Sequence, residues 1–200
     1  MLRIYYADVQ ALDVAGEYPL SAYRTERLSK IKLAQKRCES LGAELVLNYA
    51  ARELLPGHVL PLDIVCGKYG KPALRGGELE FSLSHSGGLA AAAVSDTALG
   101  LDIQEERPCN MALAKRFFAA DEIAALERSE NKDVYFTELW CRKESCIKAW
   151  GRGLSAVLNS FSVIGMPEIW HGVVDSIHFA VCVPGRQGLC PDMIKKIEPL

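Results

Sequence analysis

The segment 99–104 alternates between large apolar residues and residues of another kind, and this alternation constrains the fold more than any other feature of the chain. In an extended strand, successive side chains lie on opposite faces. The two leucines and the isoleucine therefore share one face, while Gly100, Asp102 and Gln104 share the other. Aspartate is disfavoured in strands, so Asp102 is either a hairpin-end or edge residue in water or a residue held there for a ligand.

The segment 134–150 shows helical periodicity and carries a polar stripe. Residues four apart lie above one another on a helix, so Trp140, Glu144 and Lys148 form one line. Taken alone, Glu144 and Lys148 are an exposed ion pair worth roughly 0.2 to 0.5 kcal/mol. If this stripe instead faces the polar side of the strand, the carboxylates of Asp102 and Glu144 meet, and carboxylate oxygens suit Mg²⁺. The two segments together predict a magnesium and diphosphate site.

The composition is that of an ordinary globular protein. Half of the 200 residues are apolar, 24% are charged and the net charge is −2, which argues against a disordered chain and against a nucleic-acid-binding protein. Seven cysteines occur without a Cys-x-x-Cys pair, so we expect reduced thiols and a cytoplasmic location. The longest apolar run, 89–94, is far shorter than the roughly 18 residues of a membrane helix, so we expect no membrane partner.

The first part of the chain predicts strands around one long helix. The N-terminal residues read as a strand, and apolar residues recur every three or four positions over 24–55, the pattern of a single helix. Short strands are expected at 62–66 and 80–83. The second of these runs into a loop at 84–88, where glycines permit a turn.

Two adjacent stretches, 89–95 and 99–104, are separated by three residues and form a predicted hairpin. The run of four alanines in the first stretch suits a strand packed closely beneath another element. Further on, 112–128 is an amphipathic helix in two pieces. The helix 134–150 begins at a predicted N-cap, Asp133, and ends at Gly151 or Gly153. Later strands are expected at 161–164 and 177–183.

This order of elements favours an α+β protein, with two similar halves that meet near residues 105–110. A serine-hydrolase interpretation of Ser84 and His85 fails, because adjacent residues cannot easily present a nucleophile and its base to each other. By itself, His85 is most simply a loop histidine that bonds to its own backbone. No phosphate-loop motif or dinucleotide-binding fingerprint occurs in the sequence.

Four short blocks, taken in order, resemble the 4′-phosphopantetheinyl transferases, in particular the larger, single-chain, Sfp-type members. The resemblance extends from Tyr69 to Leu154. The blocks are Tyr69-Gly70-Lys71-Pro72, Phe81 through Gly87, Gly100 through Gln104, and Trp140 through Lys148 followed by Gly151-Arg152-Gly153-Leu154.

The resemblance implies a fold and an activity. The fold is two similar α/β subdomains in one chain, 1–106 and 107–200, related by a pseudo-twofold axis, each a small, mostly antiparallel sheet packed on a long helix. The active site lies between them. The activity is Mg²⁺-dependent transfer of 4′-phosphopantetheine from coenzyme A to a serine of an apo acyl or peptidyl carrier protein, with release of adenosine 3′,5′-bisphosphate. At this length, a functional monomer is expected.

The resemblance also assigns roles at the catalytic centre. Asp102 and Glu144 are expected to bind Mg²⁺, and Glu144 is expected to accept the serine proton. Lys148 steadies the diphosphate. Many family members carry a second acid where this chain has Gln104, which can bind a metal ion through its carbonyl oxygen but brings no charge.

The remaining expected contacts are to coenzyme A. Ser84 and His85 match positions that contact its phosphates, Lys71 matches a position near the nucleotide, and Arg37 matches a basic residue for the 3′-phosphate. Further basic residues of the same region are Arg24, Arg27 and Lys30.

Two alternatives remain open. Gln104 is the sequence support for a non-catalytic protein that binds coenzyme A or a nucleotide and derives from such a transferase. A nucleotide-binding enzyme of other chemistry would be distinguished by a preference for ATP over coenzyme A.

Overall fold

The protein, described by a computed structural model over residues 1–57, 59–151 and 158–198, contains two main antiparallel sheets. The first has the strand order β4-β5-β1-β9 and is antiparallel except for the parallel pair of β1 and β9. Its strands are β1 (Leu2–Asp8), β4 (Glu80–Ser86), β5 (Leu89–Ser95) and β9 (Met193–Lys196). The second has the order β6-β8-β7. Its strands are β6 (Gly100–Glu105), β7 (Ile169–Val174) and β8 (Ile177–Cys182).

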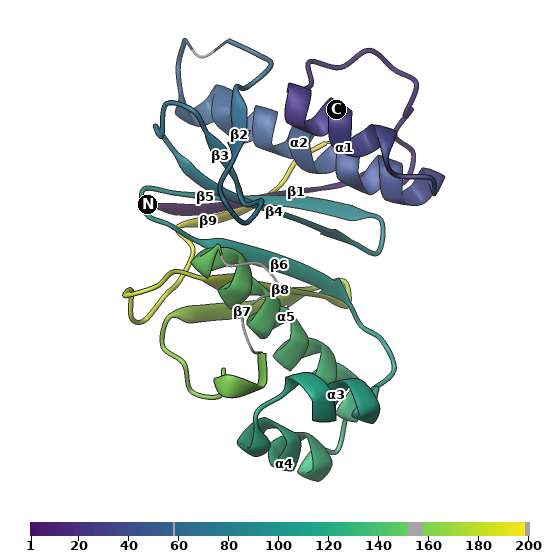
Figure 1. The fold of residues 1–200 in the computed structure, drawn as a ribbon, viewed down its shortest axis with the longest axis vertical. Helices are drawn as coiled ribbons and strands as arrows, with labels where there is room; N and C mark the ends of the chain where they lie inside the picture. The colour runs from purple at the N-terminus through teal and green to yellow at the C-terminus, as the bar shows by residue number, and fades with distance from the viewer. Residues whose placement is uncertain (58, 152–157, 199–200) are drawn as a thin grey trace.

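Helices cover the outer faces of both sheets, so the predicted α+β class is confirmed (Figure 1). On the first sheet lie α1 (Ala22–Ser29) and α2 (Ala34–Leu54). On the second lies α5 (Lys132–Trp150), with α3 (Met111–Phe117) and α4 (Ala120–Arg128) at the far end of the molecule. A small ribbon of β2 (Ile64–Cys66) and β3 (Pro72–Leu74) completes the strands. No helix among the described residues is long and apolar enough to cross a membrane.

The alanine run of β5 is buried on both faces, which confirms the prediction that it packs beneath other elements. Ala90 and Ala92 belong to the core under α2, whereas Ala91 and Ala93 belong to the core between the two sheets. Because alanine side chains are small, α2 and the second sheet can both approach this strand closely. The apolar face predicted for β6 lies in the inner core, where Leu101 packs with residues of β1 and β8.

A row of serines joins the two sheets. Along β4, residues 82, 84 and 86 point to one side because strand side chains alternate. Their hydroxyl oxygens accept hydrogen bonds from the free edge of β6, so that edge has no unpaired amides at these positions. The bonds run from the amides of Leu101, Ile103 and Glu105 to Ser82, Ser84 and Ser86, at 2.9, 3.1 and 3.1 Å. We call these three serines the serine row.

Gly100 allows α5 to lie directly against β6. A Cβ atom at this position would overlap the carbonyl oxygen of Ser145 and the amide nitrogen of Ala149, both backbone atoms of α5. Any larger residue would therefore push the helix away from the strand that carries Asp102. The space left by the missing side chain of Gly100 is therefore filled by α5.

The predicted hairpin between 89–95 and 99–104 is wrong. β5 pairs with β4 on one edge and β1 on the other, so it has no free edge for β6. The chain crosses between the sheets at 96–98, and β6 pairs with β8 instead. The strand predicted to end at residue 83 continues to Ser86, where it turns back into β5.

The single helix predicted over 24–55 is also wrong, because α1 ends at Ser29 and α2 begins at Ala34. Leu33, the N-cap residue of α2, lies in the break between the two helices and is 69% exposed. Tertiary contacts rather than periodicity therefore decide where the helix breaks. The two-piece prediction for 112–128 is confirmed by α3 and α4.

Two predictions near α5 need correction. The helix is capped by Asn131, whose side chain accepts the amide of Val134, while Asp133 in the first turn accepts the amide of Cys109. Gly151 ends the helix in the left-handed conformation, as predicted; Gly153 lies outside the described residues.

The segment 161–164 is not a strand. Its backbone is satisfied by buried side chains instead: Lys143 donates to the carbonyl of Phe161, and Glu122 accepts the amide of Val163. Strand pairing is not needed to satisfy these groups.

Candidate active site

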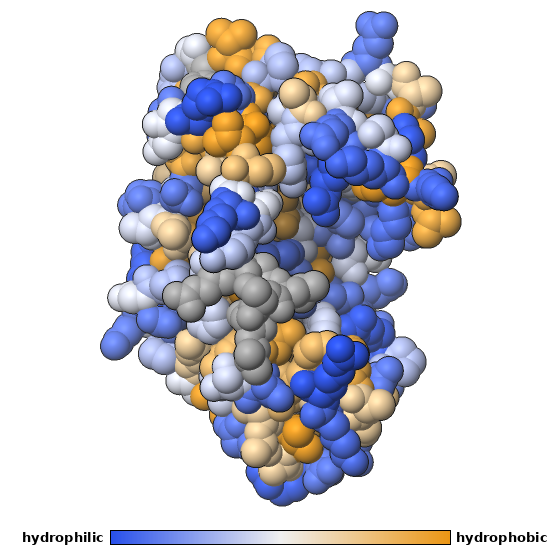
Figure 2. Space-filling view, in the orientation of Figure 1, coloured by the Kyte–Doolittle hydropathy of each residue, from blue (hydrophilic) through white to orange (hydrophobic). Residues whose placement is uncertain are grey.

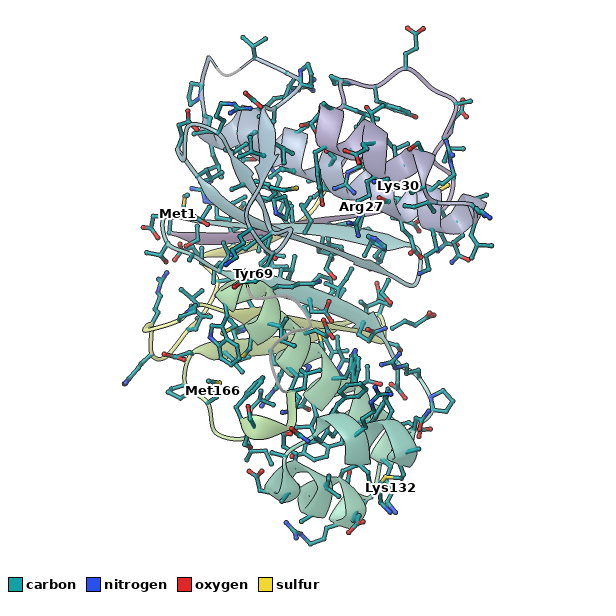
Figure 3. All side chains as sticks on the ribbon, viewed as in Figure 1. Met1, Arg27, Lys30, Tyr69, Lys132 and Met166 are labelled. Carbon is teal, nitrogen blue, oxygen red and sulfur yellow. The ribbon has the colours of Figure 1, made fainter. Side chains whose placement is uncertain are left out.

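A cavity of about 440 Å³ opens where β4 passes between the two halves of the molecule. Its lining comes from α1 and α2, the loop before β3, both sides of β4, the polar face of β6 and one face of α5. Figure 3 shows Tyr69 at the level where the sheets meet, with Arg27 of α1 and Lys30, the residue after that helix, above it. Residues from each of the four blocks that carry the family resemblance, at 69–72, 81–87, 100–104 and 140–148, thus line one cavity.

Asp102, Lys148 and Ser84 form a compact cluster in the lining of this cavity, in which Asp102 and Ser84 are buried and Lys148 is half-buried. The ammonium of Lys148 lies 2.7 Å from Oδ1 of Asp102. It also donates to the hydroxyl oxygen of Ser84 at 2.9 Å, and that hydroxyl donates in turn to Oδ1 of Asp102 at 2.9 Å. The second carboxylate oxygen, Oδ2, is buried without a hydrogen-bond partner among the described residues. The interpretation of Asp102 as an edge residue in water is therefore wrong.

Glu144 lines the same cavity from α5. Burial and the negative charge of Asp102 raise the pKa of its carboxyl group, against the opposing effect of Lys148 and Arg107. Within the described part of the chain, Glu144 makes no hydrogen bond or ion pair. The interpretation of Glu144 and Lys148 as an exposed helix pair is also wrong, since Lys148 bonds Asp102 instead.

These carboxylates fit a divalent cation. The buried oxygen of Asp102 has no partner among the described residues, and burial together with the charge of Asp102 raises the pKa of Glu144, so a cation placed between them would satisfy both groups. Gln104 lies beside them and donates its amide to Ser86 at 3.3 Å, which leaves its carbonyl oxygen for a metal ion. The described residues hold no group of three His, Cys, Asp or Glu side chains arranged for a metal. Ligand and water oxygens would therefore complete the shell, as Mg²⁺ commonly requires.

His85 lies on the opposite side of β4 from the serine row and faces α2. Its Nδ1 lies 3.0 Å from a carboxylate oxygen of Glu39, and its ring is 27% exposed in the cavity lining. The interpretation of His85 as a loop residue that bonds its own backbone is wrong: it is a strand residue held by a helix.

Of the two other residues expected to contact coenzyme A, Lys71 lines the cavity and Arg37 does not. The ammonium of Lys71 donates to the carbonyls of Leu99 and Ala149, at 2.9 and 3.3 Å, so it joins its loop to β6 and α5 at the edge of the cavity. Burial lowers the pKa of Lys71. Arg37 donates to the carbonyl of Leu28 at 3.4 Å and is not part of the lining.

Two basic residues of α1 do line the cavity. Arg24 is buried and held by Glu44 and Ser40, whereas Arg27 is exposed to solvent. Figure 2 shows a strongly hydrophilic surface over α1 and the start of α2. Because Arg24 is paired with Glu44, the guanidinium of Arg27 is the group of α1 that could meet an anionic ligand on this side.

Two features of the site were missed from the sequence. The serine row was readable as a period-two pattern of serines between Phe81 and Gly87, but we interpreted its second half as a loop. Glu39 carried no local signal, because only the fold brings it to a histidine 46 residues away. In the fourth block of the resemblance, residues 152–154 lie outside the described residues.

Comparison with known proteins places this geometry in context. A sequence model of the 4′-phosphopantetheinyl transferase superfamily matches residues 98–175, which include Asp102 and Glu144. The chain is 36% identical over 178 residues to the 4′-phosphopantetheinyl transferase psf-1 of Bacillus pumilus, covering 80% of this chain and 74% of that protein. It is 34% identical over 155 residues to the 4′-phosphopantetheinyl transferase AcpT of Salmonella typhi, covering 74% and 81%. A shorter match, 41% over 100 residues, relates it to the transferase Sfp of Bacillus subtilis, covering 48% and 44%.

Proposed function

Since the chain belongs to the 4′-phosphopantetheinyl transferase superfamily and is an enzyme of the Sfp type, we propose that it modifies an apo acyl or peptidyl carrier protein. The phosphopantetheine of coenzyme A is transferred to a carrier serine in a Mg²⁺-dependent reaction, and adenosine 3′,5′-bisphosphate is released. The observation that carries this proposal is the buried, unpartnered Oδ2 of Asp102, a residue that lines the same cavity as Glu144.

The proposal places the reaction between the two halves of one chain, 1–106 and 107–200, working as a cytoplasmic monomer. The halves would be similar α/β subdomains related by a pseudo-twofold axis. Their arrangement supports this, because each sheet packs on one long helix. Two strands cross this division, because β6 of the first half belongs to the second sheet and β9 of the second half returns to the first sheet beside β1.

Asp102 and Glu144, with the carbonyl oxygen of Gln104, would hold the metal ion. When bound, Mg²⁺ supplies positive charge to the diphosphate of coenzyme A. The protein's own contribution is geometric, because the serine row holds the strand of Asp102 to the first sheet and Gly100 lets the helix of Glu144 lie directly against that strand. Asp102 is buried and Glu144 is half-buried, and this partial exclusion of water strengthens the attraction of both carboxylates for a cation.

Glu144 is the proposed proton acceptor. The carrier serine oxygen forms a bond to the β-phosphorus, the bond from that phosphorus to the bridging oxygen breaks, and the serine proton passes to the carboxylate. A raised pKa suits this role, because a base is most effective when its pKa approaches the working pH. Lys148 would balance the charge on the diphosphate from its place beside Asp102.

The remaining groups would bind coenzyme A. His85 would contact a phosphate from the α2 side of the cavity, while Ser84 would act beside Lys148. Lys71 would shape the nucleotide end, and Arg37 would meet the 3′-phosphate from outside the present lining. The support for Ser84, His85 and Lys71 is that all three line the cavity, whereas Arg37 does not.

The direct product of this reaction provides the test. Purified protein is incubated with coenzyme A, Mg²⁺ and an apo carrier protein, and adenosine 3′,5′-bisphosphate is quantified by liquid chromatography. We expect release only when both carrier and Mg²⁺ are present. Tight binding of coenzyme A without release on any carrier would instead support the non-catalytic alternative, for which Gln104 is the structural argument. Binding of ATP in preference to coenzyme A would contradict both.

A further inference from the structure

Glu39 is a buried carboxylate whose role the reaction scheme leaves unexplained. It lies in the second turn of α2 and is 1% exposed. One of its oxygens lies 2.7 Å from the ammonium of Lys36 and 3.0 Å from Nδ1 of His85. The other accepts the amide of Gly88, at the turn after β4, at 3.3 Å. Because burying a carboxylate is costly without such partners, these contacts fix both Glu39 and the ring of His85.

The contact determines which ring nitrogen of His85 carries a proton. A carboxylate only accepts hydrogen bonds, so Nδ1 must be the donor. Nε2 is then the nitrogen left for the cavity, and no described residue bonds it. In the neutral ring Nε2 is an acceptor, which repels phosphate oxygens. Only the imidazolium, protonated at both nitrogens, donates from Nε2 to a phosphate.

We propose that Glu39 is a positioning residue that holds His85 with Nδ1 protonated, so that coenzyme A binds together with a proton at Nε2. The Nε2–H bond is then donated to a phosphate of coenzyme A. This inference rests on the proposed function, in which the same cavity binds that molecule. It assigns Glu39 a role in substrate binding that is separate from the metal-binding carboxylates.

The charges around His85 are consistent with uptake of a proton on binding. Glu39 and Lys36 face the ring from α2, and Lys148 faces it from α5. Burial lowers the pKa of His85, the contact with Glu39 raises it, and the two lysines lower it further. The free ring is therefore easily deprotonated, and an adjacent phosphate would favour the charged form.

Glu39 itself stays ionised in this environment. Burial alone would raise the pKa of its carboxyl group, but Lys36, the amide of Gly88 and His85 together hold the pKa below its ordinary value. The carboxylate thus remains an acceptor over the pH range in which histidine titrates. Lys148 does not compete for it, because its ammonium is bonded to Asp102 and Ser84.

The test is calorimetric titration of coenzyme A into the whole protein from about pH 5.5 to about pH 8.5, the range of histidine titration. Repeating each titration in two buffers of different ionisation enthalpy gives the number of protons taken up. We expect wild-type affinity to fall with rising pH, by up to about tenfold per pH unit above the midpoint. In Glu39→Gln, the midpoint should move to lower pH or the dependence should disappear, because an amide lacks the charge that supports the imidazolium.

Two further variants sharpen the comparison. Glu53→Gln removes one negative charge from the other end of α2, where Glu53 pairs with Lys195, and should keep the wild-type pH profile. In a His85→Gln background, adding Glu39→Gln should not change the profile further. If Glu39→Gln fails to fold, NMR titration of the histidine rings in the wild-type protein replaces it. The pKa of His85 should then rise when coenzyme A is bound.

The possible results distinguish a failure of this inference from a failure of the proposed function on which it rests. Coenzyme A binding with the same pH profile in the wild type and Glu39→Gln would overturn the role of Glu39 and leave the proposed function standing. An unchanged pKa of His85 on binding would do the same. Failure of the wild type to bind coenzyme A at any pH would overturn both.

Discussion

The ammonium of Lys148 lies 2.7 Å from Oδ1 of Asp102 and joins the end of helix α5 to the middle of strand β6. Oδ1 is thereby occupied, while Oδ2 remains unpartnered among the described residues. One oxygen of this carboxylate therefore fixes the geometry of the cluster, and the proposed metal site assigns the other oxygen to the cation. Ser84 bonds both members of the pair and anchors them to the first sheet.

Replacing Ser84 with alanine should damage catalysis as well as stability. The change leaves the amide of Ile103 without its partner, which costs roughly 1 to 3 kcal/mol of unfolding free energy. It also removes the hydrogen bonds that anchor the Asp102–Lys148 pair to the first sheet, so kcat should fall and more Mg²⁺ should be needed. Ser82→Ala removes the equivalent bond to Leu101 and is the matched control. Urea unfolding measures the stability of both variants, and initial rates measure their kcat. Equal losses of stability and of kcat in Ser84→Ala and Ser82→Ala would contradict this account.

Glu144→Ala should abolish turnover more completely than it weakens coenzyme A binding. General bases typically contribute about 10²- to 10⁴-fold to a rate, whereas we expect the dissociation constant for coenzyme A to change by less than about tenfold, or 1.4 kcal/mol. Glu138→Ala, on the same helix and paired with Arg142, should leave the rate nearly unchanged. Equal losses of binding and turnover in Glu144→Ala would rule out its assignment as the base.

Gln104→Glu should keep transferase activity within about tenfold, a change in barrier of about 1.4 kcal/mol. The new carboxylate adds charge beside Asp102 and Glu144, so the Mg²⁺ concentration for half-maximal rate should fall. Rates measured across a Mg²⁺ titration test both points. Complete inactivity would mean that the amide, which donates to Ser86, has a role that a carboxylate cannot fill.

Glu44→Gln should strongly destabilise the first half of the molecule. Glu44 is fully buried and pairs with Arg24 at 3.2 Å, and removing one partner of a buried pair costs about 3 to 5 kcal/mol of unfolding free energy. Glu26→Gln breaks an exposed pair with Lys30 on α1 and should leave the urea midpoint unchanged. Similar midpoints for the two variants would show that the buried pair is better solvated than its position indicates.

Acid should destabilise the protein through His171. Burial, Arg142 and His178 lower the pKa of His171 to about 4, below the roughly 6.5 of an unfolded histidine. The unfolded chain therefore binds a proton more readily, so the free energy of unfolding should fall as pH drops from about 6.5 towards 4. Unfolding of His171→Gln should show a shallower slope over that interval. An identical slope would place the acid sensitivity elsewhere.

Local periodicity was sufficient to predict the two elements at the heart of the site. Alternation placed Asp102 and Gln104 on one face of β6, and the four-residue spacing aligned Glu144 with Lys148 on α5. Both patterns are set by backbone geometry and need no knowledge of the rest of the fold. The sequence also predicted that Gly100 leaves space beside β6. It did not predict that the backbone of α5 fills this space.

Contacts between residues far apart in the sequence could not be predicted from local patterns. β6 follows β5 closely in sequence, yet it pairs with β8 about eighty residues later because both edges of β5 are already occupied. Glu39 reaches His85 only after α2 has packed on the first sheet. The serine row depends in the same way on two sheets that meet only after folding. Which partner each of these groups contacts depends on the other elements of the folded chain. The sequence of a single segment therefore does not predict it.

The most direct test of the central claim is the intact mass of a panel of apo acyl and peptidyl carrier proteins after incubation with this protein and coenzyme A. Wild-type protein and Glu144→Ala are compared, with and without Mg²⁺, at coenzyme A concentrations where both are shown to bind. We predict the phosphopantetheine mass increment on at least one carrier with the wild type and Mg²⁺, and none with Glu144→Ala or without the metal. An unmodified panel despite bound coenzyme A, or an increment that persists without Mg²⁺, would contradict the proposal that Asp102 and Glu144 form a magnesium site for this transfer.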